Sequence, residues 1–193
     1  MDKTLIKDFF NKLAPDWGDG KDINDDIINT ILDNAQVSEG KDILDVACGT
    51  GFLINYYLKR NVRFVTGVDL SDKMCEIASK RFNPENVEII CADIEEFSND
   101  KKYDAIVIYN SFPHFINGEK TICHLASMLK PNGILTVAHG MSRDRINNHH
   151  SNVSDELKCE LPEADKLAEI FSKYLQVTTI ISNEKMYQVA GRK

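Results

Sequence analysis

The sequence lacks a long apolar run of the kind that spans a membrane. Near its N-terminus, Leu5-Ile6 and Phe9-Phe10 are separated by Lys7-Asp8, so this region offers no core for a secretory signal. We therefore expect a protein that is neither secreted nor associated with a membrane and that resides in the cytoplasm.

The sequence also lacks a cysteine framework. Its five cysteines, at positions 48, 75, 91, 123 and 159, are odd in number, far apart and without a Cys-x-x-Cys pair. This pattern is typical of the reduced thiols of a cytosolic protein rather than of a disulfide-bonded or zinc-binding domain.

Basic residues are too few for a nucleic-acid-binding surface. The 23 Lys and Arg are outnumbered by 30 Asp and Glu, which gives a net charge of -7. Because phosphate contacts need clustered cations, this balance argues against nucleic acid as a partner and favours a small substrate.

With 193 residues the chain fits one domain and leaves no room for a separate substrate domain.

The most informative stretch is Ile43 to Leu53, an apolar strand followed by a glycine-rich turn and the start of a helix. Gly49 and Gly51 have no Cβ, so a ligand can approach their backbone closely. The dinucleotide pattern G-x-G-x-x-G would need a third glycine where the chain has Ile54. Asp45, just before the turn, would repel a pyrophosphate and attract an ammonium group, so the turn favours a ligand that carries an amine.

The run Asp45-Val-Ala-Cys-Gly-Thr-Gly51 resembles motif I of the class I S-adenosylmethionine-dependent methyltransferases. Further segments match that family in the same order and extend the resemblance over roughly residues 37 to 140: Gly67-Val-Asp-Leu-Ser71, Cys91-Ala-Asp-Ile94, Tyr103 to Asn110, and Leu129-Lys-Pro-Asn-Gly133. Several motifs in family order are far more specific than one glycine-rich loop.

The resemblance implies a single α/β domain over residues 1–193, with a doubly wound, seven-stranded, mostly parallel sheet of order 3-2-1-4-5-7-6 and helices on both faces. The apolar runs place strands at 42–46, 63–68, 87–91, 103–109 and 134–138, and a closing antiparallel hairpin at 175–182 and 186–190. Helical spacing predicts helices near 5–13, 23–32, 51–60, 118–129 and 162–174. Residues 1–36 would form a helical lid over the cofactor and residues 140–162 a substrate-side insert, mobile over 151–161.

The implied cofactor is S-adenosylmethionine, and its product is S-adenosylhomocysteine. Asp69, 18 residues after Gly51, stands where such folds place an acid against ribose hydroxyls, and Ser71 can cap the next helix in its place. The other cofactor residues would hold the amino-acid end (Asp45, Ala47, Gly49, Gly51), the adenine faces (Leu70, Met74), the adenine edge (Asp93, Ile94) and the end of the fourth strand (Asn110). Core packing for Met74 and an ordinary turn for Asp93 are the alternatives.

The segment Asn110-Ser-Phe-Pro-His-Phe115 departs from the Asn/Asp-Pro-Pro-aromatic run of amino-methyltransferases that act on DNA and protein. This difference disfavours methylation of base amines.

In the expected lid, Trp17 lies beside two glycines and is the candidate for a substrate-facing aromatic, whereas we expect Phe9 and Phe10 to cover the sheet.

Three histidines are candidates for the chemistry. The fourth and fifth strands should be neighbours, so His114 and His139 would emerge close together, and His150 would fold back toward them from a helix capped by Ser142. Three imidazoles could bind a divalent metal, or one could act as a general base without a metal. Phe112-Pro-His114 and His139-Gly-Met-Ser-Arg143 also resemble a subgroup of small bacterial methyltransferases.

The predicted function is in-line transfer of a methyl group from S-adenosylmethionine to a small-molecule acceptor. A binding or regulatory protein of the same fold without transfer chemistry is the alternative, and a NAD-linked oxidoreductase is a weaker one. Oxygen, sulfur, nitrogen and carbon acceptors remain open, as does the oligomeric state.

Overall fold

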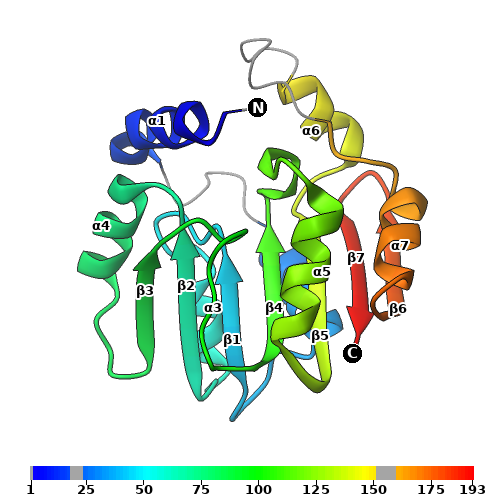
Figure 1. The fold of residues 1–193 in the computed structure, drawn as a ribbon, viewed down its shortest axis with the longest axis horizontal. Coiled ribbons are helices and arrows are strands. Elements are labelled where there is room, and N and C mark those ends of the chain that lie inside the picture. The colour runs from blue at the N-terminus through cyan, green and yellow to red at the C-terminus, as the bar shows by residue number, and fades with distance from the viewer. Residues whose placement is uncertain (1, 18–23, 151–159) are drawn as a thin grey trace.

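The computed structural model describes residues 2–17, 24–150 and 160–193, except the side chains of residues 149 and 150. Its centre is a seven-stranded sheet of order β3-β2-β1-β4-β5-β7-β6, which confirms the predicted order (Figure 1). The strands are β1 (Asp42–Val46), β2 (Phe64–Asp69), β3 (Val87–Cys91), β4 (Tyr103–Tyr109), β5 (Leu129–His139), β6 (Gln176–Ser182) and β7 (Tyr187–Arg192).

Of the strands in this sheet, β1 to β6 run in one direction, and β7 runs in the opposite direction. β1 pairs with β2 and β4, β2 with β3 and β4 with β5, all in parallel, whereas β7 is antiparallel to both β5 and β6. Central strands of this kind are covered on both faces, which explains the continuous apolar run of β4. The carboxyl ends of β1 to β5 therefore meet at one edge of the sheet, the upper edge in Figure 1.

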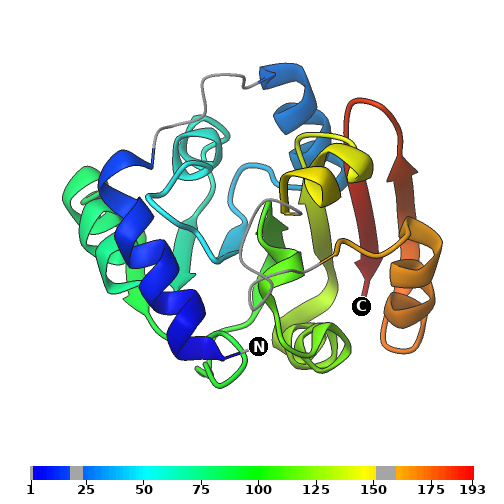
Figure 2. The same cartoon turned by 90° about the horizontal axis from the view of Figure 1, so that it is seen from above.

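Helices form a layer on each face of the sheet (Figure 2). α2 (Asp25–Asn34) and α3 (Ile54–Lys59) pack on one face, and α5 (Gly118–Met128) and α7 (Ala164–Ser172) pack on the other. α4 (Asp72–Arg81) lies beside β2 and β3. α1 (Lys3–Leu13) and α6 (Arg143–His150) lie across the carboxyl ends of the strands. Within the described segments, no helix combines the length and apolarity needed to cross a membrane.

Local sequence signals set several helix ends. The Asn24 side chain accepts from the amides of Asp26 and Ile27 at the start of α2. Ser71 caps α4 as predicted, because its hydroxyl accepts from the Met74 amide at 3.1 Å. α1 ends at Leu13, and the chain continues through a 3₁₀ turn, η1 (Ala14–Asp16), that contains the proline.

The predicted starts of one strand and one helix are wrong by three residues or more. β5 begins at Leu129 rather than at Ile134, because the stretch predicted to be a turn continues the strand after a shift in register against β4. The positive φ of Asn132, 65°, accommodates this irregularity. α3 begins at Ile54 rather than at Gly51, because the residues between them are still part of the turn.

The expected N-terminal lid is divided between two places. α1 covers the carboxyl ends of the strands, but α2 belongs to the core, where Ile28, Ile31 and Leu32 are buried. Of the expected mobile insert, residues 151–159 lie outside the described part, whereas Leu161 is buried and packs in the core. Helical spacing showed that α2 has an apolar face, but it did not show which surface that face covers.

Candidate functional site

A central cavity of about 280 Å³ lies at the carboxyl ends of the strands, beneath α1. It is lined by residues that follow β1, β2, β3 and β4 and by residues of α1. The predicted site residues that line it are Trp17, Asp45, Ala47, Gly49, Asp69, Leu70, Met74, Asp93, Ile94, Asn110 and His114. Side chains from separate parts of the sequence thus meet at the edge of the sheet where doubly wound folds bind ligands.

The two glycines of the turn have different roles. Gly49 lines the central cavity with φ +55°, and a Cβ there would meet only the Trp17 indole nitrogen, at 3.8 Å. Gly51, at φ +84°, is not among the lining residues, and a Cβ there would lie 2.7 Å from the Phe82 ring. Gly49 therefore leaves space for a ligand, whereas Gly51 is needed for the packing of the turn against Phe82.

Asp69 fastens the glycine turn to β2. Its Oδ2 accepts from the Gly49 amide at 2.8 Å, and its Oδ1 accepts from the Ser71 amide at 2.8 Å. Burial raises the pKa of Asp69, and these amide hydrogen bonds oppose the effect. A carboxylate offers about four acceptor positions, and the amides of Gly49, Leu70 and Ser71 do not use all of them, so Asp69 can still accept from a hydroxyl group of a ligand in the cavity.

Asp45 is the most strongly perturbed acid that lines the cavity. Only 2% of it is exposed, and burial raises its pKa to about 8. The neighbouring Tyr57 hydroxyl lowers this pKa, and the charge of Asp69 raises it further. A cationic group placed beside Asp45 would reverse the effect of burial, because an adjacent positive charge favours the ionised carboxylate.

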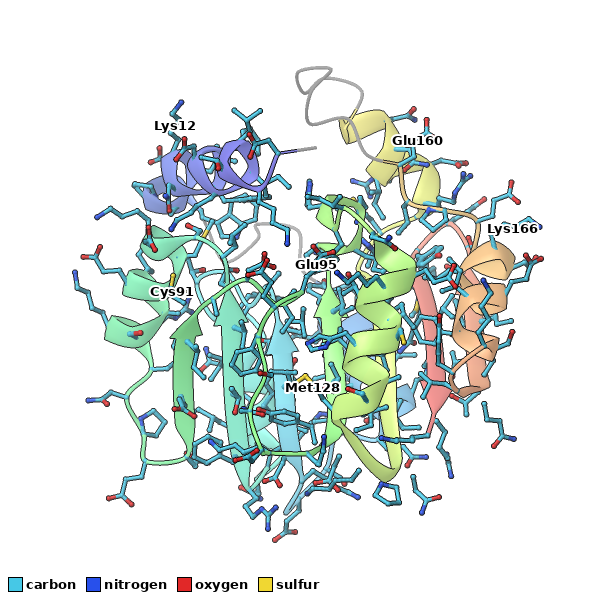
Figure 3. The ribbon with its side chains drawn as sticks, in the orientation of Figure 1. Lys12, Cys91, Glu95, Met128, Glu160 and Lys166 are labelled. Carbon is cyan, nitrogen blue, oxygen red and sulfur yellow. The ribbon has the colours of Figure 1, made fainter. Side chains whose placement is uncertain are left out.

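Lys3 of α1 forms ion pairs with two acids that follow β3. Its Nζ contacts Asp93 and lies 2.8 Å from Oε2 of Glu95. Burial lowers the pKa of Lys3, but the hydrogen bonds to the two carboxylates outweigh it and raise that pKa above its usual value. Figure 3 shows Glu95 below α1, at the carboxyl end of the sheet. No local sequence pattern indicates this contact, since 90 positions separate Lys3 from Asp93.

Three rings lie together at the outer part of the cavity. The Phe10 ring lies 5.8 Å from that of Trp17 and 5.1 Å from that of His114, both edge to face. Phe10 lines the cavity, so the expectation that it only covers the sheet is wrong. Ile6 follows Lys3 by three residues and Phe10 follows Ile6 by four, which places all three on one face of α1, and this signal could have identified Phe10.

The end of β4 shapes the floor of the cavity. Asn110 has φ 53°, and its side-chain oxygen accepts from the Gly140 amide at 3.1 Å, which ties the ends of β4 and β5 together. The preceding Tyr109 stacks on Phe52 at 5.9 Å between ring centroids. Burial raises the pKa of Tyr109 to about 12. Tyr109 and Phe52 line the cavity, and the sequence analysis did not identify either of them.

The three candidate histidines lie in different surroundings. His114 lines the central cavity, whereas His139 is 2% exposed, lies edge-on to Tyr187 at 6.1 Å and is not among the described lining residues. His150 ends α6, and its side chain lies outside the described part. Within that part, no group of three or more His, Cys, Asp and Glu side chains is arranged to hold a metal ion. A site that includes His150 stays a prediction.

The polar residues of α6 fasten the chain beyond it. Asn147 accepts from the Leu161 amide at 2.8 Å, and the Arg143 guanidinium donates to the Leu161 carbonyl at 2.9 Å. Ser142 accepts from the Arg145 amide at 3.4 Å, in accordance with its predicted capping role. The motif after β5 therefore has a structural role at residue 161.

Comparisons with known proteins place this cavity in context. Residues 43–133 match a family described as "Methyltransferase domain". The chain is 34% identical over 139 residues to a malonyl-[acyl-carrier protein] O-methyltransferase of Acetivibrio thermocellus, a match that covers 70% of this chain and 49% of that protein. It is 30% identical over 135 residues to a ubiquinone biosynthesis O-methyltransferase of Coxiella burnetii, covering 65% of this chain and 57% of that protein. The chain thus spans only about half the length of these curated relatives.

Among solved structures, the fold is similar to magnesium protoporphyrin IX methyltransferase from Synechocystis, crystallised with bound S-adenosylhomocysteine. The TM-score is 0.74, with 18% identity and full coverage of both chains. At this identity the likeness concerns the fold alone.

Proposed function

Residues 43–133 belong to the methyltransferase-domain family in a chain with the class I fold, and on this premise we propose that the protein transfers a methyl group from S-adenosylmethionine to a small-molecule acceptor. The observation that carries the proposal is the row of acids along one edge of the sheet. Asp45, Asp69 and Asp93 stand at or just beyond the ends of β1, β2 and β3, and all three line one cavity.

The chemistry of this row fits the parts of the cofactor. Asp45 beside the Gly49 turn suits the ammonium of the methionine portion, because a buried carboxylate favours a cation next to it. Asp69, which accepts from three backbone amides, retains an acceptor position for a ribose hydroxyl. Asp93 and the Ile94 amide suit the amine and a ring nitrogen of adenine, with Leu70 and Met74 against its faces.

Bound S-adenosylmethionine supplies a methyl group already activated by its sulfonium. The contribution of the chain is then to align donor and acceptor and to exclude water, which lowers the barrier through orientation rather than through covalent catalysis. α1 and Trp17 cover the outer side of the cavity, so they are placed to restrict access of water to the reacting atoms.

Asp69 offers a direct test of cofactor binding. Titration calorimetry with S-adenosylmethionine should give a saturable isotherm for the wild type and an affinity at least about tenfold lower for Asp69→Asn, because hydrogen bonds to a charged group are worth about 1.5–3 kcal/mol each. Asp33→Asn, on the exposed side of α2, is the matched control and should bind like the wild type. Unchanged affinity in Asp69→Asn would remove this residue from the site.

Transfer is tested separately from binding. Methyl-labelled S-adenosylmethionine and a small-molecule extract should yield S-adenosylhomocysteine and a labelled small molecule with the protein, and neither with heat-denatured protein. Binding without any transfer across the extract would instead support a binding or regulatory protein of the same fold. Absence of binding would overturn the proposal.

A further inference from the structure

The outer part of the central cavity differs in character from its acid-lined inner part. Phe10, Trp17 and His114, here called the acceptor box, meet edge to face at the distances given above, and Phe115 and Ile116 lie beside them in the cavity lining. Trp17 is 44% exposed and Ile116 is 46% exposed, so both offer apolar surface that a ligand would cover. Such walls favour a flat, apolar ligand that packs against the rings.

The charges around the cavity select against an anionic acceptor. Among the described residues, four acidic side chains line it, those of Asp45, Asp69, Asp93 and Glu95. Lys3 is the only Lys or Arg among the described lining residues, and it is already paired with Asp93 and Glu95. A carboxylate-bearing acceptor would meet a negative field and would have to displace an existing ion pair.

His114 is the only imidazole among the described lining residues. An imidazole with a pKa near neutrality can take a proton from a hydroxyl as the methyl group arrives. The Tyr109 hydroxyl, also in the lining, is a poor alternative because burial raises its pKa to about 12 and keeps it protonated.

We propose, building on the methyl transfer proposed above, that the acceptor is a neutral aromatic compound with a hydroxyl group, bound in the acceptor box with His114 as its base. An oxygen lone pair forms the new bond to the methyl carbon as the carbon–sulfur bond breaks, and the electron pair of that bond stays on sulfur. The hydroxyl proton passes to the His114 imidazole and then to water. The products are a methyl ether, S-adenosylhomocysteine and one proton.

The sequence contains one tryptophan, so its fluorescence reports on the acceptor box directly. The paired probes are p-cresol and p-toluate, which share a 4-methylphenyl ring and differ in the group opposite the methyl, a neutral hydroxyl in one and a carboxylate in the other. With protein saturated by S-adenosylhomocysteine, we expect p-cresol to change Trp17 fluorescence and to bind at least tenfold more tightly than p-toluate by calorimetry. Equal affinities, tighter p-toluate binding or no p-cresol binding would overturn the inference. If neither S-adenosylmethionine nor S-adenosylhomocysteine bound, the proposed function itself would fail.

Phe10→Leu tests the wall of the acceptor box. It should lower p-cresol affinity about three- to tenfold, the range that corresponds to loss of an aromatic contact of roughly 0.5–1.5 kcal/mol. Phe64→Leu is the matched control, since Phe64 begins β2 at the end of the strand opposite the cavity and is not among the described lining residues, and its p-cresol affinity should stay that of the wild type. Equal affinities in the two variants would exclude Phe10 from the acceptor site.

His114→Asn separates binding from proton transfer. It should keep S-adenosylmethionine binding, lower p-cresol affinity no more than Phe10→Leu does, because two rings of the acceptor box remain, lower kcat for p-cresol methylation about 100-fold, and remove the histidine limb of the pH-rate profile. His124→Asn is the control and should retain the wild-type profile. His124 lies on α5, its ring contacts the Phe97 carbonyl, and it is not among the described lining residues. A wild-type rate and profile in His114→Asn would overturn the role of His114.

Discussion

If the proposed function holds, we expect Asp45 to couple cofactor binding to the loss of a proton. Because its pKa is about 8 in the ligand-free protein, most molecules hold Asp45 protonated at pH 7. An ammonium group bound beside it favours the ionised form, so the proton must leave as the ligand enters.

This coupling predicts proton release at pH 7. Calorimetry of S-adenosylmethionine binding in two buffers of different ionisation enthalpy should give different apparent enthalpies for the wild type, with affinity increasing as the pH rises from about 6 toward 8. Asp45→Asn cannot release this proton, so its enthalpy should be independent of the buffer. Identical buffer dependence in both proteins would contradict the assignment.

Asp45 also determines how the free energy of unfolding changes with pH. The folded pKa lies above the ordinary value of 3.8, so the folded state binds more protons than the unfolded state between about pH 4 and pH 8. The contribution of Asp45 is therefore fully present below this range, and the free energy of unfolding falls as the pH rises through it. Ligand-free Asp45→Asn should show a flatter profile over the same range in urea titrations.

Individual site residues were predictable where a motif fixed their position on a strand end. Asp45, Asp69 and Asp93 each follow a recognisable apolar run, so their convergence on one cavity could be predicted from the parallel sheet. His139 also ends a strand, but it packs against Tyr187 instead, because the side of the sheet on which a terminal residue points depends on the packing of the neighbouring hairpin.

At the scale of elements, α1 is held in place by charge as well as by apolar contacts. Lys3 bridges to Asp93 and Glu95, and Asn11 accepts from the Ser71 hydroxyl at 2.7 Å near the other end of the helix. The Lys3 contact joins α1 to two residues that line the cavity, and the Asn11 contact joins it to Ser71, which follows the lining residue Leu70, so the position of the helix and the shape of the cavity depend on each other.

Removal of the Lys3 ammonium should loosen α1. In Lys3→Met, Glu95 loses its cation while only 10% of its side chain is exposed, and we expect amide hydrogen exchange in α1 to become about tenfold faster, equivalent to roughly 1.4 kcal/mol. Lys12→Met is the control, because Lys12 is exposed on the same helix (Figure 3) and its loss should leave exchange unchanged. Equal exchange in Lys3→Met and the wild type would show that apolar packing alone holds α1.

The sequence predicted where the elements lie better than it predicted which other elements they contact. Long apolar strands such as β4 were located correctly because burial on both faces leaves an unbroken apolar run. The start of β5 was missed because Pro131 and Gly133 indicate a turn, whereas pairing with β4 and β7 keeps the segment extended. Such contacts join residues far apart in the sequence, so local propensity carries no information about them.

At the scale of the whole molecule, one buried glutamine joins the N-terminal and C-terminal parts. The amide of Gln188 on β7 donates to the Ile31 carbonyl and to the Thr136 hydroxyl, each at 3.0 Å, and its oxygen accepts from Asn34 at 2.8 Å. α2 is therefore tied to the centre of the sheet, and the chain from α2 to β7 should unfold as one unit. A polar residue within an apolar strand gave no indication of this role in the sequence.

Gln188→Ala should destabilise the whole protein. It removes one hydrogen bond each from the Ile31 carbonyl, the buried Thr136 hydroxyl and the half-buried Asn34 amide, and at about 1 kcal/mol for each hydrogen bond lost we expect a loss of roughly 2–3 kcal/mol in the free energy of unfolding by urea. Far-UV circular dichroism and Trp17 fluorescence should still give coincident transitions. Gln176→Ala, at an exposed position on β6, is the control and should change the free energy by less than about 0.5 kcal/mol. A wild-type midpoint for Gln188→Ala would refute the linking role.

Product release follows from the acids that line the central cavity. In the proposed transfer, the sulfonium becomes an uncharged thioether, so the cofactor loses one positive charge while the carboxylates of Asp45, Asp69, Asp93 and Glu95 stay in place. Part of the electrostatic attraction that draws the donor into the cavity therefore disappears in the chemical step itself. In the proposed cycle we therefore expect this change of charge to favour the exchange of a spent, uncharged thioether for a fresh sulfonium at the start of each turnover.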